Sequence, residues 1–343
     1  MGAWRVPVRA SGALLLESKA VPAVPSAVTA AAAVFSRRRN AGGTRLVAGT
    51  VDGRILEVAL DPVLRVVGET QLRGGPVFSL ASTDAAGQGE APSLFAGTAQ
   101  RGVVDLSDGA RRMEDLRGHT GWVRSLLALP EGRLLSVGCQ WLRVWDATSG
   151  ANCGVDAPQS RGDVLATALD PGGGHVLTAS TDGTVRRWAL GEAGFALSAE
   201  ACLPLPARLD PRVRIKAASR RGGVGLADLT ELVRVTAVAA TCHAVYAGDN
   251  KGQLFTLHPT SLVSCFPCTQ LPGPITSIAV DGDSLVVGGQ FGVALFSSSP
   301  ASAGEMQPAS YAPDTPPCRC VAGVGNMRFA AGMQDGSIRL YQT

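Results

Sequence analysis

The side chains best able to do chemistry are histidines and closely spaced cysteines, and both groups are sparse. The histidines are His119, His175, His243 and His258, and the cysteine pairs are Cys265 with Cys268 and Cys318 with Cys320. A tetrahedral zinc site requires four ligands that converge on one point. Residues three apart in a β-strand face opposite sides, so the first pair does not supply half of such a site. We therefore predict no metal centre and cysteines that serve as ordinary packing residues.

Sequence motifs of common enzyme classes are also missing. The chain has no Gly-x-x-x-x-Gly-Lys phosphate loop and no Gly-x-Gly-x-x-Gly fingerprint that opens a helix. It has no Gly-x-Ser-x-Gly nucleophile elbow and no His-Glu-x-x-His zinc motif. These features predict that the protein is not an enzyme, takes no small-molecule substrate and needs no cofactor.

Composition narrows the classes of partner and compartment. The formal net charge is only +3 over 343 residues, so nucleic-acid binding would depend on a local patch. The longest nearly apolar run, residues 27–35, is about half of the ~18 residues that a membrane span requires. Eight scattered cysteines without a signal peptide favour free thiols in a reducing compartment. We predict a cytoplasmic protein without membrane insertion, with an organelle or the nucleus as the alternatives.

A repeated pattern defines the organisation of the chain. Each copy has two or three apolar residues, a small residue, a polar turn that usually contains glycine, and a second apolar strand. Seven copies begin at Leu46, Leu94, Leu134, Val176, Val245, Leu285 and Phe329. Five of the six steps, which are 48, 40, 42, 69, 40 and 44 residues, lie near the ~40–45 residues of a four-stranded propeller blade. A hairpin of this kind is barely stable alone, so we expect the copies to cover each other in a ring.

Two copies carry further motifs that identify a family. Gly118-His119 followed by Trp145-Asp146 resembles the Gly-His to Trp-Asp frame of WD40 repeats, with Ser136 between them. In the next copy Thr178, Asp182 and Trp188 stand where that family places a hydroxyl, a turn acid and a tryptophan. The resemblance implies internal hydrogen-bond networks made of His119, Ser136 and Trp145, and of Thr178, Asp182 and Trp188. It implies an all-β, seven-bladed β-propeller of four-stranded antiparallel blades that acts as a non-catalytic scaffold.

The first residues of the chain have two interpretations. The last copy stops before a fourth strand, and the family completes its last blade with an N-terminal strand, for which residues 13–19 are the candidate. Residues 27–35 would then form the innermost strand of the first blade. A basic, Ala-rich start is also typical of a cleaved targeting peptide, and a shorter address within residues 1–10 is a third possibility. We expect one domain over residues 1–343, in which residues 1–12 form a flexible or targeting segment.

One face of the expected ring collects the candidate binding residues. The turn after each second strand and the connections between blades meet there, and they contribute Arg101, Trp122, Trp141, Lys251 and Phe291. The single long step implies an insertion of roughly 25 residues between blades four and five, at residues 205–231, on the same face. Its basic residues include Arg212, Arg214, Arg220 and Arg221. Exposed aromatic and arginine side chains dominate the energetics of protein interfaces.

Three functions fit these residues. The first is a scaffold or adaptor that holds protein partners as a subunit of a larger assembly. The second is binding of RNA or another nucleic-acid backbone through the Arg-rich insertion. The third is a substrate receptor of a cullin-type ubiquitin ligase, a role that the family marks with Arg or Lys two residues after Trp-Asp. Here Trp145-Asp146 is followed by Ala147 and Thr148, which places the third function last.

Overall fold

The computed structural model shows an all-β fold, as the repeats predict. The described residues are 19–21, 26–36, 43–61, 63–83, 93–100, 102–106, 119–153, 157–158, 162–191, 194–203, 233–282, 284–297, 308, 310–311, 315–325 and 327–342. Within these ranges every regular element is a strand, and no helix is present. None of the described segments therefore offers a helix long and apolar enough to cross a membrane.

The strands form antiparallel sheets, which we number in chain order. Sheet one has β2 (Val28–Ser36), β3 (Gly43–Thr50), β4 (Arg54–Ala59) and β5 (Arg65–Gln71). Sheet two has β6 (Val77–Thr83), β7 (Ser93–Thr98) and β8 (Val103–Asp105). Sheet three has β9 (Val123–Leu129), β10 (Arg133–Gly138), β11 (Trp141–Asp146) and β12 (Ala157–Pro158).

The remaining sheets repeat the same order. Sheet four has β13 (Val164–Leu169), β14 (His175–Ser180), β15 (Thr184–Gly191) and β16 (Gly194–Cys202). Sheet five has β17 (Val235–Ala240), β18 (Val245–Asp249), β19 (Gln253–Leu257) and β20 (Ser264–Gln270). Sheet six has β21 (Ile275–Asp281), β22 (Ser284–Gly289), β23 (Gly292–Ser297) and β24 (Ser310–Tyr311). Sheet seven has β25 (Cys318–Gly325), β26 (Arg328–Met333), β27 (Ile338–Gln342) and β1 (Lys19–Val21).

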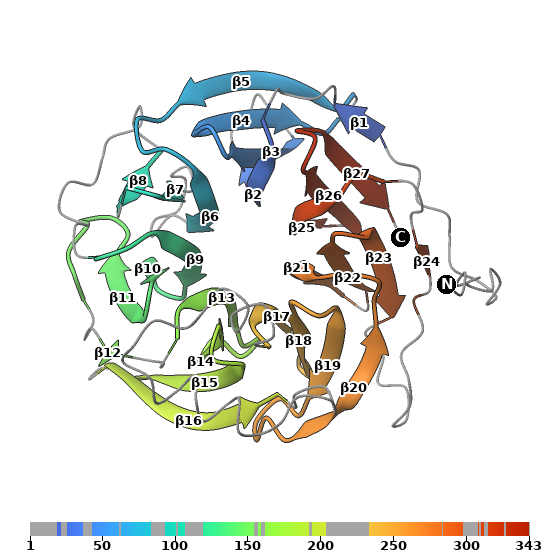
Figure 1. The fold of residues 1–343 in the computed structure, drawn as a ribbon. Coiled ribbons are helices and arrows are strands. Elements are labelled where there is room, and N and C mark those ends of the chain that lie inside the picture. The colour runs from blue at the N-terminus through green and yellow to red at the C-terminus, as the bar shows by residue number, and fades with distance from the viewer. Residues whose placement is uncertain are drawn as a thin grey trace, which may run out of the picture.

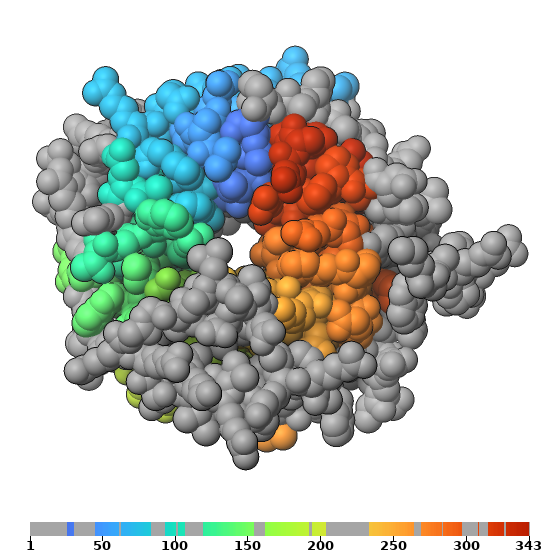
Figure 2. Space-filling model, in the orientation of Figure 1, coloured from blue at the N-terminus to red at the C-terminus, as the bar shows by residue number. Residues whose placement is uncertain are grey.

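The sheets stand around a common centre, an arrangement consistent with a β-propeller (Figure 1). The first strand of sheets one to seven lies nearest the centre, and the space-filling view leaves an opening there (Figure 2). All seven second strands that the repeats predict are present, and each begins within three residues of the expected position. Residues 27–35, expected as an innermost strand, correspond closely to β2.

The turns between second and third strands explain why the repeats contain glycine. Gly183 and Gly252 have φ angles of 79° and 85°, a region in which other residues are strained. A Cβ atom on Gly252 would also come too close to the carbonyl oxygens of Leu271 and Gly273. Glycine therefore lets the chain reverse tightly and lets the following connection pass close by.

Sheet seven combines the two ends of the described chain. β1 pairs with β27 in antiparallel register, with Val21 opposite Ile338 and Lys19 opposite Leu340. The N-terminal strand is thus described at residues 19–21, and of the expected residues 13–19 only Lys19 lies within the described part. The two predicted segments 1–12 and 205–231 also lie outside it.

The cores lie between neighbouring sheets, because each sheet packs side chains against both of its neighbours. One buried cluster joins sheets one and seven through Val28, Leu46 and Leu56 on one side and Cys320 and Ile338 on the other. Similar clusters join sheets four with five and five with six. An ion pair also links sheets one and seven. The charged atoms of Arg328 and Asp61 are 3.2 Å apart, although 267 residues separate the two in the sequence. Burial between sheets therefore positions every inner strand around the centre.

Candidate functional site

Each inner strand has an irregularity at its second residue. The register with the neighbouring strand skips one residue there, which is a β-bulge, and this happens in sheets one to seven. The skipped residues, which we call the bulge ring, are Thr29, Phe78, Arg124, Leu165, Thr236, Thr276 and Arg319. Because a bulge re-aims a side chain, these positions are free of the alternation that governs the rest of the strand. The side chains at these positions therefore indicate which of them bond neighbouring sheets and which could bind a partner.

Threonines in the bulge ring fasten one sheet to the next. The Thr276 hydroxyl donates to the carbonyl of Cys318 in sheet seven at 2.8 Å, and the Thr236 hydroxyl donates to the carbonyl of Ile275 in sheet six at 2.5 Å. Thr29 makes the same bond to Val77 in sheet two. Small residues let the sheets approach here, since a Cβ atom on Gly248 would lie 2.5 Å from Ile275. Threonine at this position thus has a structural purpose.

Sheets two and three have no such threonine, and an aromatic and basic cluster takes its place. The rings of Phe78 and Trp122 stack with centroids 5.3 Å apart and an interplanar angle of 26°. The guanidinium carbon of Arg124 lies 4.8 Å from the Phe78 centroid and 4.6 Å from the Trp122 centroid. We call these three residues the aromatic-basic seam. Trp122 retains 49% of its surface exposure, so the seam presents a large ring to solvent.

The charge on Arg124 is only partly covered. Burial lowers the pKa of Arg124, and the nearby exposed carboxylate of Asp163 opposes this shift. A guanidinium remains charged in proteins, so Arg124 is a cation that lies over two rings. A guanidinium that contacts aromatic rings can still donate hydrogen bonds from its N–H edges. The seam can therefore offer an aromatic surface and a directed pair of donors at one place.

Behind the seam, sheet three contains a buried hydrogen-bond network. The Ser136 hydroxyl lies 2.7 Å from His119 Nε2 and accepts a 2.7 Å hydrogen bond from Trp145 Nε1. All three residues are buried, and burial lowers the pKa of His119 to about 4 with a further contribution from Arg143. His119 is therefore neutral at physiological pH. This network fixes the segment that ends at Trp122.

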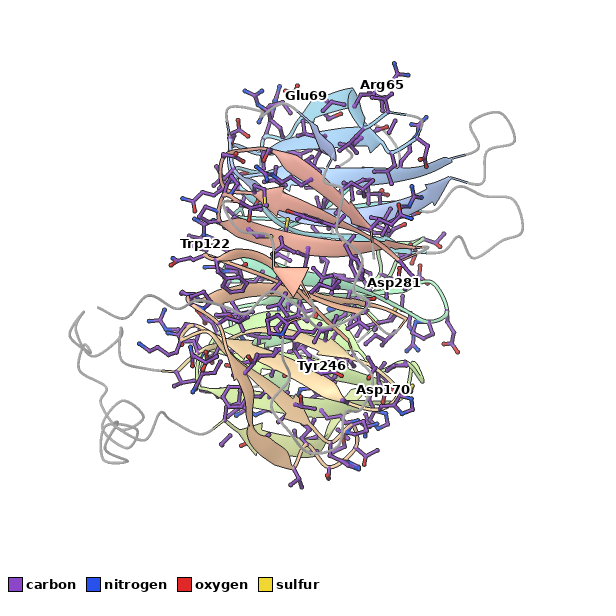
Figure 3. All side chains as sticks on the ribbon, turned by 90° about the vertical axis from the view of Figure 1, so that its right-hand side faces the viewer. Arg65, Glu69, Trp122, Asp170, Tyr246 and Asp281 are labelled. Atoms are coloured by element: carbon purple, nitrogen blue, oxygen red, sulfur yellow. The ribbon has the colours of Figure 1, made fainter. Side chains whose placement is uncertain are left out.

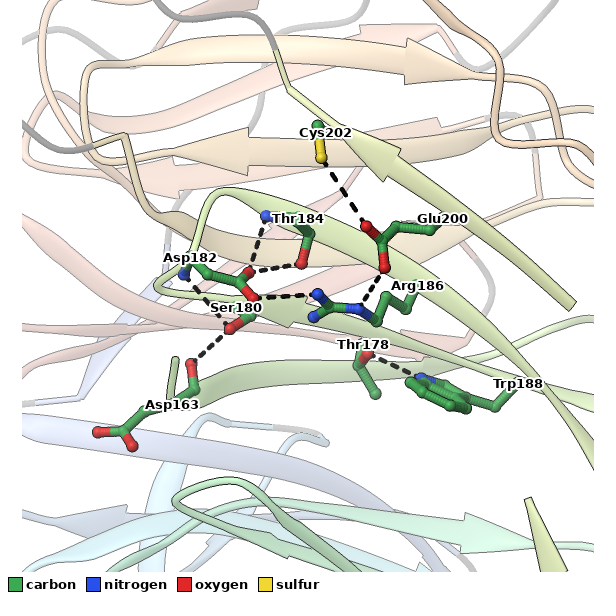
Figure 4. Close-up of polar contacts among 9 residues, drawn as sticks. All are labelled: Asp163, Thr178, Ser180, Asp182, Thr184, Arg186, Trp188, Glu200 and Cys202. Carbon is green, nitrogen blue, oxygen red and sulfur yellow. Dashed lines mark hydrogen bonds and ion pairs between the residues drawn. The ribbon is translucent and has the colours of Figure 1, made fainter. Parts of the chain in front are cut away.

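Sheet four has a smaller version with a different role for its acid (Figure 4). Trp188 Nε1 donates to the Thr178 hydroxyl at 3.0 Å. Asp182 accepts from Thr184 at 2.5 Å and pairs with Arg186 at 3.1 Å, so it braces its own turn instead of contacting Thr178 or Trp188. Burial raises the pKa of Asp182, but the Thr184 hydroxyl and the Arg186 charge outweigh it, and the pKa lies below its usual value. The acid is a turn residue here.

The molecule has two faces, on which the described candidate binding residues can be placed. Trp122 lies on the face opposite Asp170 and Asp281 (Figure 3), and we name these the Trp122 face and the Asp170 face. Trp141 is half-buried and begins strand β11 opposite Gly138, on the Trp122 side of that strand. Trp141 was expected within a tight turn, but the turn ends one residue earlier and Trp141 is the first residue of the strand.

Two more candidates are tied to their own sheets. Phe291 packs partly against the core between sheets five and six, with its ring over Gly289. Lys251 is half-buried in the turn that Asp249 braces. The remaining candidates, Arg101, Arg212, Arg214, Arg220 and Arg221, lie outside the described residues. Sequence patterns did not single out Phe78 or Arg124, because each occupies an ordinary position of an alternating strand until the bulge is known.

Comparison with known proteins finds matches over part of the chain. The model of the WD domain, G-beta repeat family matches residues 111–146 and 157–189, which include the four strands of sheet three and, in sheet four, β13, β14 and most of β15. The DENN domain and WD repeat-containing protein SCD1 of Arabidopsis thaliana is 27% identical over 158 residues, which is 45% of this chain and 12% of that protein. The match thus spans only a small part of the relative.

These matches agree with the networks of sheets three and four. Residues 111–146 and 157–189 of the chain thus match WD40 repeats. Proteins with such repeats are in general scaffolds for protein interaction and are typically not catalytic.

Proposed function

We propose that the protein is a non-catalytic scaffold that holds a protein partner on its Trp122 face, as a subunit of a larger assembly. In this proposal the seven sheets are the blades of one closed propeller, and the partner contacts the aromatic-basic seam. Closure matters because it fixes the inner strands around one opening and gathers residues from distant repeats onto one face.

Contacts between sheets one and seven support closure. Cys320 Sγ lies 4.0 Å from the carbonyl oxygen of Val28, and a Cβ atom on Gly332 would collide with the Val28 side chain. The same approach occurs between Gly248 and Ile275 in sheets five and six. The first and last sheets therefore meet through the same type of contact as sheets next to each other in sequence.

The observation that carries the proposal is the exposed, stacked ring of Trp122. Single exposed apolar residues are common and need no explanation. Trp122 differs because Phe78 and Arg124 hold it in one orientation, and neither of these two makes the seam bond that threonine makes elsewhere. A pre-oriented tryptophan loses little side-chain entropy on binding, which is the property of an interface anchor.

Affinity capture with a matched control tests the proposal. Tagged wild-type protein, Trp122→Ala and Leu197→Ala are expressed in the cells of origin, and the captured proteins are quantified by mass spectrometry. Leu197 is the control because it is 51% exposed on outer strand β16. We expect Trp122→Ala to retain its thermal unfolding midpoint and to lose the main partner by about tenfold or more. Equal recovery of that partner with all three proteins would refute the proposal.

A further inference from the structure

The Trp122 face has an imbalance of charge that points to the chemistry of its partner. Among the described residues, the acids in the turns between second and third strands are engaged within those turns: Asp52 with Arg54, Asp182 with Arg186, Asp249 with the amides of Lys251 and Gln253, and Asp335 with Ser337. Three arginines on this face, Arg73, Arg124 and Arg319, have no ion pair within the part of the chain that the structure describes. Unlike the acids, they are available to a partner.

These three arginines lie on or next to the inner strands. Arg124 and Arg319 occupy equivalent places in the bulge ring, in sheets three and seven, and Arg319 is exposed. Arg73 is exposed in the connection that leads into β6, five residues before Phe78. Among the described residues, the carboxylate of Asp163 acts on Arg124. Cations thus gather around the inner strands, where an incoming chain would meet several repeats.

We propose that the partner segment at this face is acidic and carries an aromatic or large apolar side chain next to a carboxylate. This inference rests on the proposed function and adds the chemistry of recognition to it. The apolar side chain packs on the exposed face of Trp122, and the carboxylate accepts paired hydrogen bonds from the edge of Arg124. Arg319 and Arg73 attract further acids of the same segment.

A protein segment fits these observations better than a nucleic acid. Three described arginines with an opposing aspartate give few phosphate contacts, whereas nucleic-acid affinity depends on many. A guanidinium that lies over two stacked rings is suited to a planar carboxylate, and one exposed indole is suited to one side chain. Together these features favour a short peptide with mixed acidic and aromatic character.

Synthetic peptides measured by calorimetry with the full chain test the inference. The probe is a peptide of about ten residues in which Glu and Gly alternate around a central Phe, and its control has Gln at every Glu. We expect the Glu peptide to bind about tenfold more tightly at low salt, and the difference to shrink as salt rises. Arg124→Gln should remove most of this preference, and Arg319→Gln should reduce it severalfold.

Controls separate the possible failures. Arg133→Gln, on the Asp170 side of sheet three and paired with Glu131 at 3.3 Å, should leave binding unchanged. Arg124→Lys keeps a charge without the flat fork, so it should recover only part of the preference, and its thermal midpoint reports on folding. Equal affinity for the Glu and Gln peptides, or no binding at about 1 mM, overturns the acidic preference.

Two further outcomes bear on the charge selectivity and on the class of partner. If the wild-type protein binds the Glu and Gln peptides equally and Trp122→Ala weakens both, the docking face stands and its charge selectivity fails. If a single-stranded oligonucleotide of similar length binds more tightly than the Glu peptide and depends on Arg124, the partner is a nucleic acid and the inference is wrong.

Discussion

Sheets three and four differ from sheets five to seven in how they are held. In sheets three and four a buried tryptophan donates to a hydroxyl of the neighbouring strand, as Trp145 does to Ser136 and Trp188 does to Thr178. In sheets five to seven the equivalent bonds run between sheets, from Thr236 and from Thr276. The first region has these tryptophan bonds within each repeat, beside one bond across repeats between the hydroxyls of Ser125 and Thr167, and the second region has its threonine bonds across repeats.

The difference explains where family motifs are visible. A bond within a repeat needs particular residues at fixed spacing, so it leaves a pattern that a family model matches over residues 111–189. A bond between sheets needs only a hydroxyl and a small partner residue, which many sequences supply. The other sheets therefore keep the same architecture with little of the motif. The aromatic-basic seam lies where sheet two meets sheet three, and sheet three is one of the two sheets with a tryptophan bond within the repeat.

The largest expected effect removes the hydroxyl at the centre of the sheet-three network. Ser136→Ala leaves the Trp145 Nε1 donor and His119 Nε2 without their buried partner, and each such loss costs about 1–2 kcal/mol. We expect the free energy of unfolding to fall by about 3 kcal/mol, measured by denaturant titration. Thr178→Ala, which loses one such bond, should cost about 1 kcal/mol. Equal losses in the two variants would show that the networks are not the basis of the difference.

The second effect is the pH dependence that His119 of sheet three contributes. The pKa of His119 is about 4 in the folded protein and near 6.5 when the chain is unfolded. The unfolded state therefore binds a proton first, and stability present above pH ~6.5 is lost as the pH falls towards ~4. Between pH ~7 and ~5 the loss should be about 2 kcal/mol. His119→Gln should flatten this part of the profile, and an unchanged slope would contradict the assignment.

The smallest effect concerns the bonds between sheets. Thr276→Val removes a hydroxyl that contacts the carbonyls of Cys318 and Gly288 at 2.8 and 3.1 Å. We expect a loss of about 1 kcal/mol in the free energy of unfolding. Thr70→Val, at an exposed position of outer strand β5, is the matched control and should change stability little. A similar loss in both variants would remove the distinction between the two regions.

Much of the fold could be predicted because hairpins depend on local patterns. The second strands follow from apolar runs bounded by glycine turns, and β2 follows from the apolar run before the first copy. The candidate site could not be predicted in the same way. The role of Phe78 and Arg124 depends on bulges, which are set by contacts between sheets far apart in sequence. Trp122 was visible, since it precedes a strand beside His119, but its stacking partners were not.

The pairing of β1 with β27 imposes an order on synthesis. Val21 leaves the ribosome long before Ile338, its partner across the strands. During that interval the first strand has no edge on which to settle, whereas the hairpins between them can form as they emerge. The last assembly step therefore joins the earliest and latest segments of the described chain, and contacts this distant in sequence form slowly.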